Sequence, residues 1–358
     1  MTDSVKVTNL DEEGSGQPRR LRRERPRGGA ESPADLNDLR WVARVWVLVF
    51  VFAAVTLVWS QHVGVPLRDP RGQMFSGRLR SALELFVLLA LADSLIRTVW
   101  TTGFLHGAFD NLRRRWPWRR IVLAVSGLVA YHVVYVCYRN LKSWAAFNTP
   151  RDHDLLAFER WLFLGHSPAD LLHQLLGHDH AAYVLMVVYR LFSHLVPLAV
   201  VGALVFPHRI REGYVFLTSA MWVWILGVCS YYLIPSLGPF ASDPGDFAAL
   251  PESAITRTQT GYLAQRAELL ADPSTHGAFA SISAFASLHV AFSCLILLML
   301  RYYGQYFLAW LMTAFVGATM LATVYFGWHF VVDDIAGVLL AALAVLLGRA
   351  MVRPRGGP

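Results

Sequence analysis

Apolar residues along the chain are concentrated in eight runs of about 20 residues, a length that crosses the hydrocarbon core of a bilayer. The runs cover 41–60, 82–101, 121–139, 181–205, 214–235, 285–303, 306–326 and 330–349. Polar segments separate the runs and indicate loops. The pattern predicts an all-α fold, a polytopic membrane helix bundle with about eight transmembrane helices.

The ends of the chain have a different pattern. Residues 1–38 are rich in Gly, Pro, Ser, Arg and acidic residues without an apolar period, which predicts a disordered basic cytoplasmic tail. Residues 351–358 form a short second basic tail. No small-residue cleavage pattern separates the first tail from the first run, so that run is interpreted as an uncleaved span.

Two polar segments, 140–180 and 236–284, are too long to be simple connections. Each contains an amphipathic stretch, Leu155 to Leu164 in the first and Ile255 to Leu270 in the second. Such stretches favour helices at a membrane surface. We expect them to form a lid on one side of the membrane.

Composition supports the membrane interpretation, because 55% of residues are hydrophobic and only 16% are charged. Too few charged residues are present to cover a water-soluble globule. The cysteines Cys137, Cys229 and Cys294 lie in three separate apolar runs, which argues against a disulfide framework and against a cysteine-based metal site.

The formal net charge of +7 reflects an arginine-rich chain in which only Lys6 and Lys142 are lysines. The basic run in the first tail precedes a span, where such runs usually face anionic lipid, so we predict no nucleic-acid partner. One short loop holds Arg113, Arg114, Arg115, Arg119 and Arg120. Such loops stay on the inner side, which predicts cytoplasmic N- and C-termini in the cell (plasma) membrane, with 140–180 and 236–284 outside.

Two histidines begin apolar runs on the predicted outer side, His289 in the sixth run and His329 in the eighth. Asp333 follows His329 by one helical turn, so its carboxylate can contact the imidazole. An acid that fixes one tautomer makes the histidine a better base or nucleophile. Simple pairing at a helix end is the alternative, but ionisable residues at membrane depth favour a functional site.

Three further residues on this side are candidates for anion binding. Ser287 lies just before His289, where a helix start can bind an anion, although such a serine can also be only an N-cap. Lys142 and Arg139 lie one turn apart at the end of the third run, where snorkelling is the alternative. Together these side chains can hold and attack a phosphate. The His-rich stretch 166–180 matches no zinc spacing, so we predict no metal and no cofactor.

The segments around both histidines resemble the second and third motifs of the type 2 phosphatidic acid phosphatase superfamily. The flanking residues 232–239 and Phe285 to His289 are most similar to its inositol phosphorylceramide synthase-like branch. The resemblance covers the last six runs. It implies a six-helix catalytic membrane domain over 121–350, preceded by two extra N-terminal transmembrane helices in 39–120.

The resemblance also implies a mechanism without metal. His329 would be the nucleophile that forms a phosphohistidine, Asp333 would orient His329, and His289 would be the general acid. Ser287, Lys142 and Arg139 would bind the substrate phosphate. The first-motif arginine stays open between Arg139 and Arg151, and Thr323 stands where the third motif usually has arginine.

The function expected from these features is cleavage of a lipid phosphoester or diphosphate on the extracytoplasmic face. The partner is a membrane lipid phosphate; water as acceptor makes the protein a phosphatase, and a small alcohol such as inositol makes it a phosphotransferase. A bis-histidine haem protein and a transporter are the alternatives from other classes, the latter suggested by Asp93, Arg97, Arg190 and His194 within apolar runs. The lipid and the oligomeric state stay open.

Overall fold

The computed structural model describes residues 39–102, 107–275 and 277–353. Within these residues the regular structure is helical and contains no strand, which confirms the all-α prediction. The predicted tail 1–38 and most of 351–358 lie outside the described residues. The helices are α2 (Arg40–Val63), α3 (Arg78–Thr102), α4 (Ala108–Arg115), α5 (Trp118–Trp144), α6 (Asp152–Leu162), α7 (Pro168–Leu176), α8 (His180–Val205), α9 (Ile210–Leu233), α10 (Pro239–Ser242), α11 (Ala254–Ala271), α12 (Leu288–Tyr302), α13 (Tyr306–Tyr325) and α14 (Val331–Val352).

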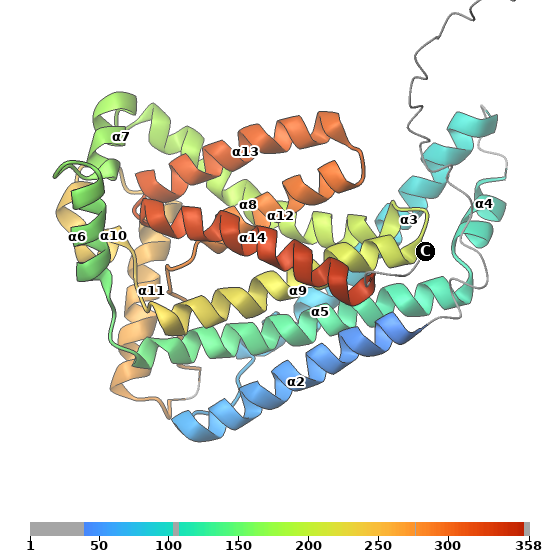
Figure 1. The fold of residues 1–358 in the computed structure, drawn as a ribbon, viewed down its shortest axis with the longest axis horizontal. Helices are drawn as coiled ribbons and strands as arrows, with labels where there is room; N and C mark the ends of the chain where they lie inside the picture. The colour runs from blue at the N-terminus through green and yellow to red at the C-terminus, as the bar shows by residue number, and fades with distance from the viewer. Residues whose placement is uncertain (1–38, 103–106, 276, 354–358) are drawn as a thin grey trace, which may run out of the picture.

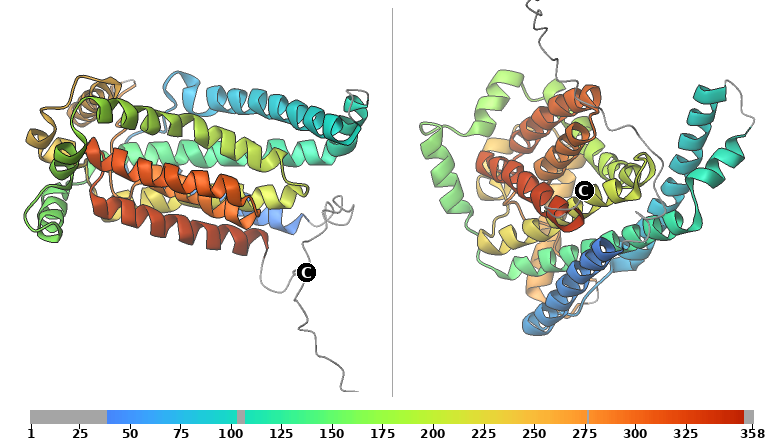
Figure 2. Two further views of the ribbon diagram at one scale, coloured as in Figure 1. Left: turned by 90° about the horizontal axis from the view of Figure 1, so that it is seen from above. Right: turned by 45° about the vertical axis from the view of Figure 1, so that its right-hand side comes forward.

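Each of the eight apolar runs corresponds to one long helix, and these helices pack along one another as a bundle (Figures 1 and 2). Among the described residues, six helices are long and apolar enough to cross a membrane: α2, α5, α8, α9, α13 and α14. The other two fall short for different reasons. Helix α3 carries Glu84, Asp93 and Arg97 within its length, and α12 has only 15 residues.

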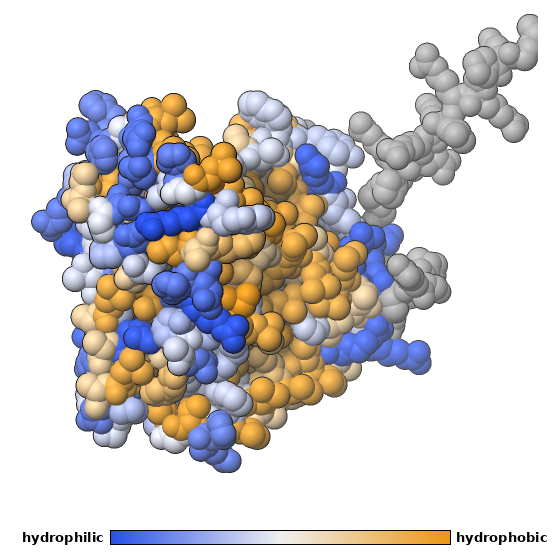
Figure 3. All heavy atoms as spheres, turned by 60° about the vertical axis from the view of Figure 1, so that its left-hand side comes forward, coloured by the Kyte–Doolittle hydropathy of each residue, from blue (hydrophilic) through white to orange (hydrophobic). Residues whose placement is uncertain are grey.

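Both amphipathic stretches are helices, α6 and α11, as the sequence predicts. They gather with α7 and α10 at one end of the bundle, whereas α4 lies at the opposite end (Figure 1). We call α6, α7, α10 and α11 the end helices. The surface near them is mixed and more hydrophilic, and hydrophobic residues cover the surface farther away (Figure 3).

Helix α9 forms the centre of the core, packed against α5, α8, α12 and α14. Helix α14 lies close to the start of α12, where the Ser287 N–H donates to the Asp333 carbonyl at 3.0 Å. Gly337 permits this approach, since a Cβ there would lie 2.5 Å from the Ser287 carbonyl oxygen. The segments that carry His289 and Asp333 are therefore packed tightly together.

Helices α3 and α4 lie at the edge of the bundle (Figure 2) and join it through buried polar contacts. Asp93 forms ion pairs with Arg97 and Arg115. Arg115 also donates to the carbonyls of Val205 and Phe206 at the end of α8, where helix carbonyls lack intrahelical partners. Arg115 of the basic loop therefore also links α4 to the end of α8, in addition to its expected role in setting the membrane topology.

Candidate active site

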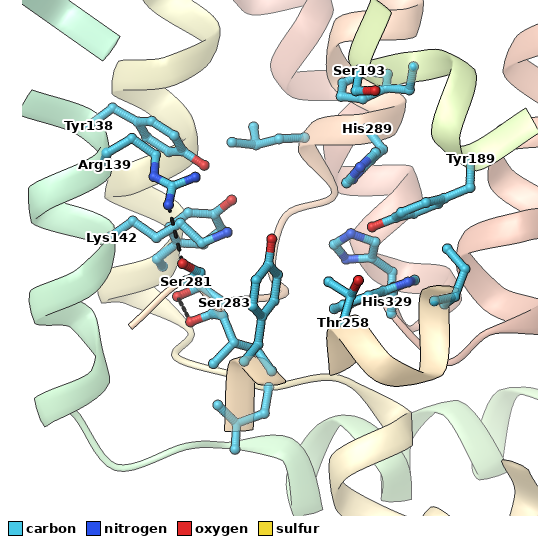
Figure 4. Close-up of a pocket in the computed structure, with 18 of the residues that line it drawn as sticks. Tyr138, Arg139, Lys142, Tyr189, Ser193, Thr258, Ser281, Ser283, His289 and His329 are labelled. Carbon is cyan, nitrogen blue, oxygen red and sulfur yellow. Dashed lines mark hydrogen bonds between the residues drawn. The ribbon is translucent and has the colours of Figure 1, made fainter. Parts of the chain in front are cut away.

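A cavity of about 400 Å³ lies near the end helices and contains both candidate histidines. It is bounded by α5, α8, α9, α11 and α12, and by the loop before α14 (Figure 4). Its polar and aromatic lining includes Tyr135, Tyr138, Arg139, Lys142, Tyr189, Arg190, Ser193, Tyr231, Thr258, Tyr262, Ser281, Ser283, His289 and His329.

The two histidines face the same cavity with their ring centroids 6.2 Å apart. His329 Nδ1 lies 3.3 Å from Asp333 Oδ2, and Asp333 is completely buried. The same carboxylate oxygen accepts the Phe330 N–H at 3.1 Å. Asp333 is therefore held in place by the helix start, and the i,i+4 contact expected from the sequence is present.

The cavity holds His329 in its neutral form. Burial is the main cause that lowers the pKa of His329 to about 3, and the positive charge of Lys142 adds to it. A hydrogen bond with the Ala284 backbone acts in the opposite direction. Because this pKa lies far below neutrality, the imidazole keeps a free electron pair over the physiological pH range.

Aromatic side chains of α8 position His289. Its ring stacks on Tyr189 with centroids 4.4 Å apart, and Phe192 contacts it at the same centroid distance. Tyr189 also stacks on Trp328, the neighbour of His329, at 5.8 Å. The sequence predicts no site role for these residues, because α8 lies about a hundred residues earlier in the chain and no local spacing connects it with His289.

The predicted cations line the wall of the cavity formed by α5, across from the histidines (Figure 4). Lys142 Nζ lies 5.2 Å from the centroid of the Tyr231 ring. Arg139 Nη2 donates to Ser281 Oγ at 3.2 Å. Arg151 is exposed at the start of α6 and does not line the cavity. Of the two arginines that the sequence left open, the geometry favours Arg139.

This difference between the two arginines leads to a testable expectation. Arg139→Gln should lower kcat/KM for a lipid phosphate about 10- to 100-fold, because a charged hydrogen bond to the phosphate is lost. Arg151→Gln removes the same charge outside the cavity and should stay within about twofold of wild type. Steady-state phosphate release measures both variants, and an equal loss in the two would refute the assignment of Arg139.

Ser287 has a structural position. It is completely buried at the N-cap of α12, where its Oγ accepts the Val290 N–H, and it does not line the cavity. The expected phosphate contact of Ser287 is not supported by this placement, because the close packing of α14 covers it. Ser193, Ser281 and Ser283 are the serines that line the cavity (Figure 4).

The end helices hold the backbone of the loop that carries His329. From α6, Glu159 Oε1 accepts the Val331 N–H at 2.6 Å. From α11, Gln259 Nε2 donates to the Phe326 carbonyl at 2.7 Å. Both side chains are buried, so these contacts exclude water and fix the loop on both sides of His329.

Two more end helices contact the same loop. In α7, His173 Nε2 donates to the Tyr325 carbonyl at 2.8 Å. In α10, the Phe240 N–H donates to the Gly327 carbonyl at 3.0 Å. The segments expected to form a lid therefore also support the candidate nucleophile, and His173 of the His-rich stretch has a structural contact.

Asp334 is a further buried acid, absent from the candidates that the sequence indicates. Its Oδ2 accepts the Thr323 hydroxyl at 2.9 Å. Thr323, which replaces the arginine of the third motif, therefore binds an acid of α14 instead of facing the cavity. The adjacent pair Asp333 and Asp334 in an apolar run was the available signal for this contact. The described residues contain no group of three or more His, Cys, Asp or Glu that could hold a metal ion.

A family model described as PAP2 superfamily matches residues 153–347. The chain belongs to the PAP2 superfamily. Membership supports a phosphatase-type lipid phosphoesterase in general terms. The matched segment contains His289, His329 and Asp333 but begins after Lys142. Searches of curated proteins and of solved structures find no match.

The contact between α6 and α14 in this PAP2 protein should depend on pH. Burial is the main cause that raises the pKa of Glu159 from its ordinary 4.5 to about 7, with the Val331 N–H opposing and the charge of Asp333 adding. The folded state thus binds the proton more tightly than the unfolded chain. The resulting stabilisation is complete below pH 4.5 and is lost as the pH rises through about 7.

Glu159→Gln should remove this dependence, because glutamine stays neutral and keeps an acceptor oxygen for Val331. From acidic to alkaline pH, the unfolding free energy of the variant should rise by about 3 kcal/mol relative to that of the wild type. Thermal unfolding in detergent at several pH values measures it. The matched control is Glu268→Gln, an exposed glutamate of α11. A difference that stays constant with pH would contradict the expectation.

Proposed function

We propose that this PAP2 protein cleaves a lipid phosphoester or diphosphate through a phosphohistidine on His329. The observation that carries the proposal is the pair of histidines facing one cavity, with ring centroids 6.2 Å apart and a buried acid on one of them. Attack requires reacting atoms about 3–3.5 Å apart, and proton transfer requires a hydrogen bond of about 3 Å. We place the phosphoryl group between the two rings, where both requirements apply to it.

The chemistry follows from the orientation of the groups. Asp333 contacts Nδ1 of His329, which leaves Nε2 as the nucleophile. The P–N bond forms as the bond to the leaving oxygen breaks, and His289 gives that oxygen a proton. Lys142 and Arg139 neutralise the charge on the phosphoryl oxygens. Water or an alcohol then attacks phosphorus and frees His329, and no step uses a metal ion.

The reaction is assigned to the extracytoplasmic face of the cell (plasma) membrane. The cavity lies near the end helices, whereas the arginine-rich helix α4 lies at the opposite end of the bundle (Figure 1). Short basic loops remain on the cytoplasmic side. Both termini are then cytoplasmic, and the cavity faces the opposite leaflet.

Transfer to an alcohol acceptor is the second candidate function. Helix α11 covers one side of the cavity, where Thr258 and Tyr262 contribute to the lining. Such a cover can exclude water and protect a phosphohistidine from hydrolysis. The resemblance of residues 232–239 to the inositol phosphorylceramide synthase-like branch points the same way.

Phosphate release from a panel of lipid phosphates tests the proposal. Purified protein is assayed in EDTA, with and without inositol or glycerol. Release into water identifies a phosphatase, whereas release only with the alcohol, and recovery of the phosphate group on that alcohol, identifies a phosphotransferase. Failure to cleave any lipid phosphate under either condition would refute the proposal and favour a transporter.

A further inference from the structure

Arg190 is a charged residue in the middle of a membrane-spanning helix. It follows the start of α8 by ten residues, about 15 Å at 1.5 Å per residue. Only 17% of the apolar window of this helix is buried, and Arg190 is exposed. A cation at such depth is costly unless it serves a cavity or a partner.

Arg190 also lines the cavity, so the cavity reaches the surface of the bundle beside α8. Among the described residues, no acidic side chain or carbonyl accepts a hydrogen bond from its guanidinium. The nearby hydroxyl of Ser193 donates to the backbone carbonyl of Arg190, not to its guanidinium. The guanidinium therefore has charge and donors available for a ligand that enters from the membrane.

The position of Arg190 indicates which part of a ligand it meets. Its neighbours in α8, Tyr189 and Phe192, both contact the ring of His289. Lys142 belongs to α5 on the opposite wall (Figure 4). The cavity thus carries cations on two walls, and the cation of α8 belongs to the wall of the general acid.

We propose that Arg190 binds a second acidic group on the leaving-group side of the scissile bond. The inference rests on the proposed function, in which His289 protonates the leaving oxygen. It names the substrate class as a lipid diphosphate, whose leaving group is itself an anionic lipid phosphate. A lipid monophosphate leaves a neutral alcohol and gives Arg190 no partner.

The step balances without a further reactant. The terminal phosphorus forms a bond to His329 Nε2, and its bond to the bridging oxygen breaks. The bridging oxygen takes the electron pair and the proton of His289, and departs as the lipid monophosphate. Arg190 stabilises the charge carried by that product. Water then hydrolyses the phosphohistidine to inorganic phosphate.

A pair of substrates with equal prenyl chains isolates this contact. The wild-type protein should cleave a prenyl diphosphate with a kcat/KM about 10- to 100-fold above that for the prenyl monophosphate, the range expected for a charged hydrogen bond. Arg190→Gln should remove this preference and change cleavage of the monophosphate less than about twofold. Arg190→Lys keeps the charge and should retain part of the preference.

Arg80→Gln, at an exposed position of α3, is the matched control and should keep the preference. Retained cleavage of the monophosphate shows that the Arg190→Gln protein is folded. Equal losses on both substrates, or no change on either, would overturn the inference while the proposed function stands. Equal cleavage of both substrates by the wild-type protein would also overturn the inference and leave the proposed function standing. A wild-type protein that cleaves neither substrate would overturn both proposals.

Discussion

Substitution of His329 by glutamine should abolish phosphate release, with a fall in kcat of about 10⁴-fold or more. The covalent route requires a nitrogen nucleophile at this position, and the side-chain amide of glutamine cannot replace it. Glutamine has a size close to that of histidine and can still contact Asp333, so the packing of the loop should persist. Steady-state release measures the loss, and short incubation with labelled substrate should yield an acid-labile phosphoprotein in wild type only.

The control is His194→Gln, which removes an exposed histidine of α8 that does not line the cavity. This variant should keep its rate within about twofold of wild type. Thermal unfolding of both variants in detergent separates lost chemistry from lost folding. If His329→Gln keeps even a tenth of the wild-type rate, His329 is not the nucleophile.

The sequence was sufficient for features that depend on local spacing. Apolar length located each long helix, and amphipathic patterns located α6 and α11, because burial against lipid or a neighbour imposes these periods. The four-residue spacing of His329 and Asp333 predicted their contact, although His329 lies in the loop just before α14 and not on a helix turn with Asp333. Among the predicted spans, only α3 and α12 are not apolar enough or long enough to count as membrane-crossing helices in the described residues. The apolar run alone does not show the effect of the charges inside α3 or the late start of α12.

Features that depend on tertiary packing could not be predicted. Glu159 contacts Val331 across more than a hundred and fifty residues, and no pattern in either segment indicates the contact. In the sequence, Ser287 is compatible with both an N-cap, the commoner role of such a serine, and a phosphate site, and the packing of α14 over it is visible only in the structure. The choice between Arg139 and Arg151 required the direction in which the end of α5 faces.

Substitution of His289 by glutamine should produce a loss that depends on the leaving group. With an alkyl lipid phosphate the rate should fall about 10²- to 10⁴-fold, the usual contribution of general acid catalysis. With nitrophenyl phosphate, whose leaving group is stable as an anion, the rate should remain within about tenfold of wild type. Phosphate release from the two substrates provides the comparison, and the nitrophenyl activity shows that the variant is folded.

The same two substrates distinguish the role of His289 from that of His329. A nucleophile is needed for every substrate, so His329→Gln should lose both activities, whereas a proton donor is needed only when the leaving oxygen is basic. Equal losses of both activities in His289→Gln would show that this histidine positions the phosphate instead. A lipid diphosphate should fall between the two substrates, because its leaving phosphate is an anion that Arg190 already stabilises. We therefore expect the two residues on the α8 side of the cavity to make separable contributions to departure of the product, His289 by donating a proton and Arg190 by supplying charge.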